Sequence, residues 1–80
     1  MAWHITKDHI GTDQAGTKSI SGDDINLPYK YRFRLIDDDG AAYYTGLSTD
    51  EDFDPLDEFG EPFAGCPAIQ YRDGGKWIYL

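Results

Sequence analysis

Acidic side chains are concentrated in one short segment, which is the part of the sequence best suited to binding. Residues 47–66 contain seven carboxylates and no Lys or Arg, so they hold −7 of the net charge of −8. Carboxylates at this density repel nucleic acid and anionic lipid, and they attract cationic protein surfaces and metal cations. The seven candidate partner-binding residues are Asp50, Glu51, Asp52, Asp54, Asp57, Glu58 and Glu61.

The spacing of five of these carboxylates resembles that of a calcium-binding loop. Positions 1, 3, 5, 9 and 12 of such a loop would be occupied by Asp50, Asp52, Asp54, Glu58 and Glu61. Position 6 must be glycine because the chain turns sharply there, but Pro55 holds that position and its ring fixes φ at about −65°. We therefore expect no calcium site and no cofactor, only the loose association of cations with a carboxylate cluster.

Residue types that carry transition-metal or nucleophilic chemistry are scarce. His4 and His9 are five residues apart, and the single cysteine, Cys66, has no second cysteine at a zinc-finger spacing. No motif of a nucleophilic enzyme surrounds Cys66. A chain of 80 residues also rarely encloses a substrate pocket. The sequence therefore predicts a binding module and not an enzyme.

The N-terminal sequence and the cysteine content predict the cellular compartment of the protein. The first eight residues, MAWHITKD, lack the basic region and the apolar run of a signal peptide. No stretch is long and apolar enough to span a bilayer. One cysteine cannot form an internal disulfide, which fits a reducing compartment. We expect one small cytoplasmic domain, residues 1–80, that binds neither membranes nor nucleic acid directly.

Two hairpins and an N-terminal strand predict a mainly β, or small α+β, fold with an antiparallel sheet of about five strands. Residues 29–36 alternate between apolar and basic side chains, the period of a half-buried strand. The turn-forming residues 37–40 lead into a returning strand at 41–45. Residues 2–6 add a short strand on which Trp3 and Ile5 share a face.

The second hairpin comprises residues 68–72 and 76–80, joined by Asp73, Gly74 and Gly75. A two-residue turn places Ile69, Tyr71, Ile78 and Leu80 on one face. The other face then carries Gln70, Arg72, Trp77 and Tyr79. We interpret four basic residues of the two hairpins as a solvated outer face rather than a nucleic-acid surface. They are Lys30, Arg32, Arg34 and Arg72.

Two connections remain. Residues 11–26 are rich in Gly, Ser, Thr and Asp, and predict a mobile loop or a local turn capped within residues 21–24. Residues 49–62 form an acidic loop that contains a short helix at 55–59. We expect Asp54 to cap that helix and Gly60 to end it. Leu56 and Phe59 then face the sheet, whereas the sequence leaves the role of Phe53 open.

The acidic segment matches the charge density of a nucleic acid only when it is compact. Fully extended, twelve residues span roughly 40 Å and carry one charge per ~6 Å. Coiled at ~1.5 Å per residue, they carry one charge per ~2.6 Å. A single DNA strand carries one charge per about 3.4 Å and a duplex one per about 1.7 Å. The alternative is a solvated loop that serves only solubility.

Four stretches of the sequence resemble small acidic bacterial proteins of phages and plasmids. They are YRFRLIDDDG at 31–40, YYTG at 43–46, DFDPLDEFG at 52–60 and IQY at 69–71. The likeness covers residues 27–80 and is one of style and layout. In size, charge and compactness the chain is also similar to DNA-mimic inhibitors, among them certain anti-CRISPR proteins, which present carboxylates where phosphates would lie. That resemblance implies binding to nucleic-acid-binding machinery, and it transfers no residue roles.

The leading hypothesis is therefore a protein-binding module, a monomer or weak dimer, whose residues 50–61 dock on a basic surface of a nucleic-acid-binding protein. The alternative is a structural or assembly module in which the acidic loop is passive. Such a module would pair through a sheet edge or through Trp77 and Tyr79.

Overall fold

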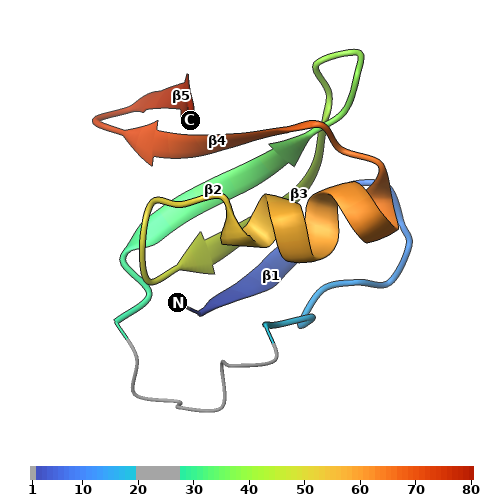
Figure 1. The fold of residues 1–80 in the computed structure, drawn as a ribbon, viewed down its shortest axis with the longest axis horizontal. Coiled ribbons are helices and arrows are strands. Elements are labelled where there is room, and N and C mark those ends of the chain that lie inside the picture. Colours follow the sequence, from blue (N-terminus) through green and yellow to red (C-terminus); the bar gives the residue numbers. More distant parts are fainter. Residues whose placement is uncertain (1, 20–27) are drawn as a thin grey trace.

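The structure is a computed structural model that describes residues 2–19 and 28–80. Five antiparallel strands form one sheet in the order β1-β3-β2-β4-β5, and a helix lies across one face of it (Figure 1). The elements in chain order are β1 (Trp3–Asp8), β2 (Tyr31–Ile36), β3 (Ala42–Ser48), the π-helix η1 (Leu56–Ala64), β4 (Ala68–Asp73) and β5 (Lys76–Tyr79). The predicted mainly β fold, with two hairpins, an N-terminal strand and one short helix, is confirmed.

The register of the sheet separates its two faces. Directly opposed residues on antiparallel strands point to the same side. The row on the face beneath η1, the inner face, is Ile5, Gly46, Phe33, Tyr71 and Ile78. The neighbouring row on the opposite, outer face is Lys7, Thr45, Arg34, Gln70 and Tyr79. Apolar residues therefore dominate one side of the sheet, and polar or basic residues dominate the other.

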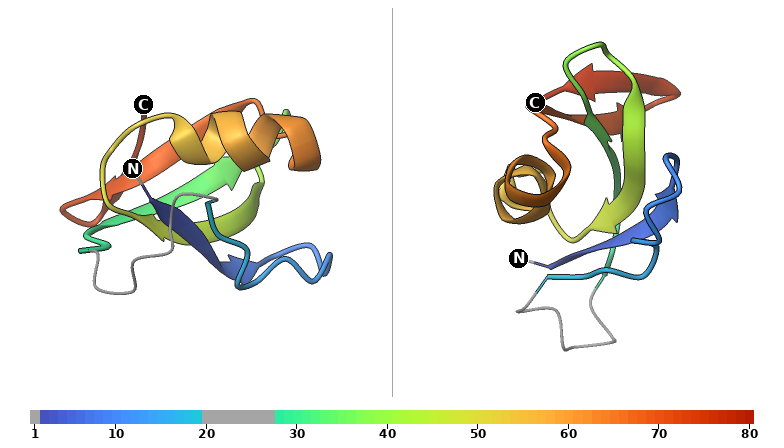
Figure 2. Two further views of the ribbon diagram at one scale, coloured as in Figure 1. Left: turned by 60° about the horizontal axis from the view of Figure 1, so that its bottom comes forward. Right: turned by 90° about the vertical axis from the view of Figure 1, so that its right-hand side faces the viewer.

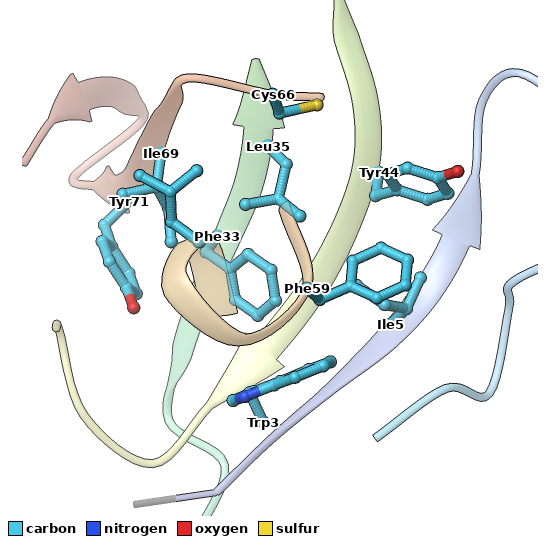
Figure 3. Close-up of a cluster of buried hydrophobic side chains, with 10 residues drawn as sticks. Trp3, Ile5, Phe33, Leu35, Tyr44, Phe59, Cys66, Ile69 and Tyr71 are labelled. Atoms are coloured by element: carbon cyan, nitrogen blue, oxygen red, sulfur yellow. The ribbon is translucent and has the colours of Figure 1, made fainter. Parts of the chain in front are cut away.

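The hydrophobic core lies between the inner face and η1. Phe33 and Leu35 of β2 are completely buried, and Phe59 of η1 packs among them (Figure 3). The ring of Phe59 contacts the ring of Tyr44 edge-on, with 5.1 Å between centroids, and lies 5.9 Å from that of Trp3. Such aromatic pairs add about 0.5–1.5 kcal/mol each to the free energy gained by burying apolar area. Aromatic contacts thus compensate for the small aliphatic content.

Gly46 makes room for the central core residue. It lies in the inner row between Ile5 and Phe33. A Cβ atom at this position would collide with the backbone carbonyl oxygen of His4 and would lie only 2.6 Å from Cζ of Phe33. The backbone of β1 and the ring of Phe33 together occupy the space that any larger side chain at position 46 would need.

The β4–β5 hairpin turns at Gly74 and Gly75, whose φ angles are +57° and +94°. Asp73 pairs with Lys76 and Tyr71 pairs with Ile78, so the loop has two residues. Two successive positive φ angles match the right-handed twist of the strands, and glycine adopts them without strain. Tyr71 and Ile78 therefore share one face of the hairpin, and Gln70 and Tyr79 share the other, as the sequence predicts.

The helix ends later than the sequence predicts. η1 runs to Ala64, with Pro55 rather than Asp54 at its N-cap, and it stops at Gly65 in the left-handed conformation at φ +67°. Gly60 lies inside the helix. A glycine is needed there because a Cβ would approach Cδ1 of Leu56 to 2.9 Å and Cδ2 of Leu35 to 3.3 Å. Its role is therefore close packing against the sheet, not termination. Pro62 also lies within the helix.

Residues 14–19 run along the outer edge of β1. The amide of Ile5 donates to the carbonyl of Thr17 at 2.7 Å, and the amide of Ser19 donates to that of Trp3 at 3.0 Å. One edge of the sheet is thereby covered. The predicted helical turn at 21–24 lies outside the described residues, and the mobility expected for 11–26 stays a prediction.

Candidate functional site

The acidic segment is fixed to the sheet at the point where it leaves β3. The hydroxyl of Ser48 donates to the carbonyl of Asp50 at 2.7 Å. Residues 51–55 then lead into η1, where the amide of Asp57 donates to the carbonyl of Phe53 at 2.8 Å. The segment is thus folded back on the domain and compact, not extended into solvent (Figure 2).

Tyr71 of β4 holds the middle of the segment. Its hydroxyl donates to the carbonyl of Asp52 at 2.7 Å and accepts from the amide of the same residue at 3.2 Å. Burial raises the pKa of this phenol to about 12, so the hydroxyl keeps its proton at any physiological pH. One side chain therefore satisfies both backbone groups of Asp52.

Trp3 of β1 holds the helix from the other side. Its indole N–H donates to Oε1 of Glu58 at 2.7 Å, while its ring is buried beside Phe59. A hydrogen bond to a charged acceptor is stronger than one between neutral groups. Glu58 consequently serves the fold, and it is only partly available to a partner.

The seven predicted residues fall into two groups. Asp50 accepts from the hydroxyl of Thr49 at 3.0 Å, and Asp52 accepts from the amide of Asp54 at 3.1 Å; the side chains of all three aspartates are half-buried. The exposed residues are Glu51, Asp57, Glu58 and Glu61. Setting Glu58 aside, a partner reaches three carboxylates without breaking a hydrogen bond made within the described part of the chain.

The carboxylates act on one another electrostatically. Burial raises the pKa of Asp52, and the negative charges of Asp54 and Asp50 raise it further. A like charge nearby disfavours the ionised form. Burial is the main cause of the raised pKa of Asp52. The smaller effect of Asp54 and Asp50 reflects a local negative potential, which is the property that attracts a cationic partner.

The five carboxylates with calcium-loop spacing do not converge on a point. Among residues 2–19 and 28–80, no three His, Cys, Asp or Glu side chains gather closely enough to hold a metal ion. Pro55 is buried at the start of η1 with φ −61°, so the loop that would wrap a cation is replaced by a helix.

Aromatic side chains border the carboxylates. Phe59 is buried, as the sequence predicts, whereas Phe53 is 47% exposed and Phe63 is 78% exposed. Beside Phe63, a hollow of about 580 Å³ opens between η1 and residues 17–19. The surface formed by the exposed carboxylates Glu51, Asp57 and Glu61 together with Phe53 and Phe63 is called the acidic surface below.

Within the described part of the chain, His4, His9 and Cys66 are not assembled into a site. His4 packs edge-on against Tyr29 with centroids 4.5 Å apart, and His9 hydrogen-bonds the hydroxyl of Thr45 at 2.7 Å. Cys66 is completely buried, and its burial raises the pKa of the thiol to about 11. A protonated, buried thiol is a poor nucleophile.

Two residues that position the acidic surface were not evident from the sequence. Tyr71 and Trp3 read simply as apolar residues of the inner face. Their polar atoms contact residues 19 and 55 positions away, and strand periodicity carries no information about such distant partners. The side-chain types alone could have indicated these contacts, because a buried Tyr or Trp usually needs a hydrogen-bond partner for its O–H or N–H.

Comparisons with protein-family models, with curated proteins and with solved structures found no match to this chain. Within the described residues, the single helix is too short and too polar to cross a membrane. The functional argument therefore rests on the acidic surface itself.

Proposed function

We propose that this chain is a protein-binding module whose acidic surface docks on a Lys/Arg-rich surface of a nucleic-acid-binding protein. The carboxylates occupy the places where that partner would otherwise hold phosphates. No covalent chemistry is required of the chain.

The observation that carries the proposal is the compaction of the charges on η1. Asp57 and Glu61 of the acidic surface, with the partly available Glu58 between them, lie within five residues of one helix. At ~1.5 Å per residue this is a rise of about 6 Å, or roughly one charge per 2–3 Å. That spacing is comparable with one charge per about 3.4 Å along a single nucleic-acid strand. In an extended loop of the same composition, the charges would be too widely spaced to match a nucleic-acid strand.

Two features favour a binding surface over a loop that serves only solubility. Phe53 and Phe63 expose large apolar area in the same segment as the charges, and aromatic residues, Phe included, are enriched at the cores of protein interfaces. The segment is also held in place by Tyr71 and Trp3. A surface that is ordered before binding avoids part of the entropy cost of association.

The test uses two variants with equal net charge. The segment variant carries Glu51→Gln, Asp57→Asn and Glu61→Gln. The matched control carries Asp38→Asn, Asp39→Asn and Asp73→Asn, which neutralise three exposed carboxylates outside the segment.

Affinity for a captured basic partner is then measured by calorimetry at low and moderate salt. We expect the segment variant to bind about ten- to hundredfold more weakly, because each exposed ion pair is worth up to about 1 kcal/mol. The control should bind like the wild type. Equal weakening of both variants would mean that only net charge matters, and the proposal would fail.

A second candidate function is assembly through a sheet edge. It is favoured by the position and exposure of β5. Residues 14–19 cover the β1 edge, whereas β5 forms the other end of the strand order and its Ile78 and Tyr79 are 48% and 58% exposed. Unpaired edge strands with apolar side chains pair with other chains. Light scattering tests this: edge pairing gives a dimer that persists at high salt and is abolished by Ile78→Lys.

A further inference from the structure

Positive charge gathers on the outer face of the sheet, opposite η1. Lys7 and Arg34 lie in one cross-strand row, and Arg32 and Arg72 occupy outer-face positions of β2 and β4. None of the strand residues that the register places on the outer face is acidic. The chain is therefore polarised across the sheet, with the acidic surface on one side and these four cations, called the basic face below, on the other.

Trp77 of the end strand β5 organises the part of the basic face formed by Arg34 and Arg72. The guanidinium carbon of Arg34 lies 4.5 Å from the centre of its indole, and that of Arg72 lies 5.4 Å away. Nε of Arg34 donates to Oε1 of Gln70 at 2.6 Å. Gln70 is only 6% exposed, so this buried side chain fixes the position of the Arg34 guanidinium.

These contacts select a type of ligand. A guanidinium that stacks on an aromatic ring uses its flat face and keeps its in-plane N–H donors for a carboxylate or phosphate. The indole is already packed against two guanidinium groups, so it is a poor platform for stacking a nucleic-acid base. The basic face is therefore better suited to side-chain carboxylates than to single-stranded nucleic acid.

We propose that the basic face receives the acidic surface of a second copy of this chain. The two surfaces are complementary in charge, and both are present on every molecule. Because they lie on opposite sides of the sheet, the contact is head-to-tail, and it produces open chains unless the rotation between copies closes a ring. The association is salt-sensitive because exposed charges are screened beyond about 8 Å at physiological ionic strength.

This inference rests on the same acidic surface as the proposed function, but a different surface receives it. The two can fail separately. A chain whose basic face is altered keeps its acidic surface and should still bind the basic partner protein. A chain whose acidic surface is altered should lose both activities.

The experiment exploits the asymmetry of a head-to-tail contact. The basic-face variant carries Lys7→Gln, Arg32→Gln and Arg72→Gln, all at exposed positions. The segment variant described above lacks the acidic surface instead. Lys18→Gln with Lys76→Gln, two exposed lysines outside the basic face, is the control, and Arg72→Gln alone serves if the triple variant does not fold.

Weight-average mass is measured by analytical ultracentrifugation at about 20 mM and about 0.5 M salt, where the screening length falls below about 8 Å. We expect the wild type and the lysine control to exceed the monomer mass of 9.0 kDa at low salt only. Each of the two variants alone should stay monomeric, and an equimolar mixture should form a one-to-one dimer, since one intact surface of each kind remains.

Three results would overturn the inference. The wild type could remain at 9.0 kDa at low salt, the mixture could stay monomeric, or the variants could associate as strongly as the wild type. Binding of a single-stranded oligonucleotide by the segment variant, without association in the mixture, would assign the basic face to nucleic acid instead.

Discussion

Replacing Tyr71 with Phe isolates the contact that holds the acidic segment against the sheet. The substitution keeps the ring, which is buried 6.1 Å from the ring of Phe33, and removes the hydroxyl that bonds both backbone groups of Asp52. A net intramolecular hydrogen bond is worth about 0.5–1.5 kcal/mol, and an unsatisfied buried group costs about 1–3 kcal/mol. Asp52 is half-buried, so water replaces part of what is lost. We expect a loss of about 1–2 kcal/mol.

The assay is urea unfolding followed by tryptophan fluorescence, with thermal unfolding beside it. For a domain of this size, 1 kcal/mol shifts the melting temperature by roughly 4–8 °C. The slope of the urea transition should not change, because the surface exposed on unfolding is the same. Tyr79→Phe, at a 58% exposed tyrosine, is the control and should change little. If Tyr71→Phe and Tyr79→Phe were equally stable, the proposed anchoring of the segment would be refuted.

Three further changes test the same structural account. Trp3→Phe removes the indole donor to Glu58 and should lower stability by about 1–3 kcal/mol, whereas Glu58→Gln, which keeps an acceptor, should cost less; equal losses in urea unfolding would contradict this. Gly46→Ala places a Cβ against the backbone carbonyl oxygen of His4 and within 2.6 Å of Cζ of Phe33, and it should cost about 1–3 kcal/mol through overpacking; a melting temperature like that of the wild type would show that the strand and the core yield there. The pKa of Asp8 is lowered to about 2: desolvation opposes the shift, but hydrogen bonds from residues 10, 12 and 14 outweigh it. Its contribution to stability is thus fully present above the unfolded value of 3.8 and is lost as pH falls toward 2; in urea midpoints measured against pH, Asp8→Asn should lose this increment and show a shallower acid decline.

The sheet could be predicted from the sequence because its determinants are local. Alternation across residues 29–36 and the Gly74–Gly75 turn establish strands and facing within a few positions of each residue, and the register bears them out. The end of the helix could not be predicted in the same way. A glycine at position 60 is typical of a helix end, but its actual role depends on its contact with Leu35, a residue of strand β2 that is distant in the sequence.

The candidate site was predictable in composition and not in geometry. Charge density along the chain identifies the acidic segment without any structure. Which carboxylates remain available depends on Tyr71 and Trp3, whose bonds to the segment span 19 and 55 positions. The segregation of acidic and basic residues onto opposite faces likewise follows from where η1 packs, because helix packing decides which side of the sheet is covered.

The most direct test of the central claim is capture of a partner from a bacterial lysate by immobilised wild type, segment variant and matched control. The account predicts that wild type and control retain the same basic, nucleic-acid-binding protein at low salt. It also predicts that duplex DNA displaces this protein and that the segment variant does not retain it. Equal retention by the segment variant, or a retained protein that DNA does not displace, would contradict the claim that the acidic surface takes the place of phosphates.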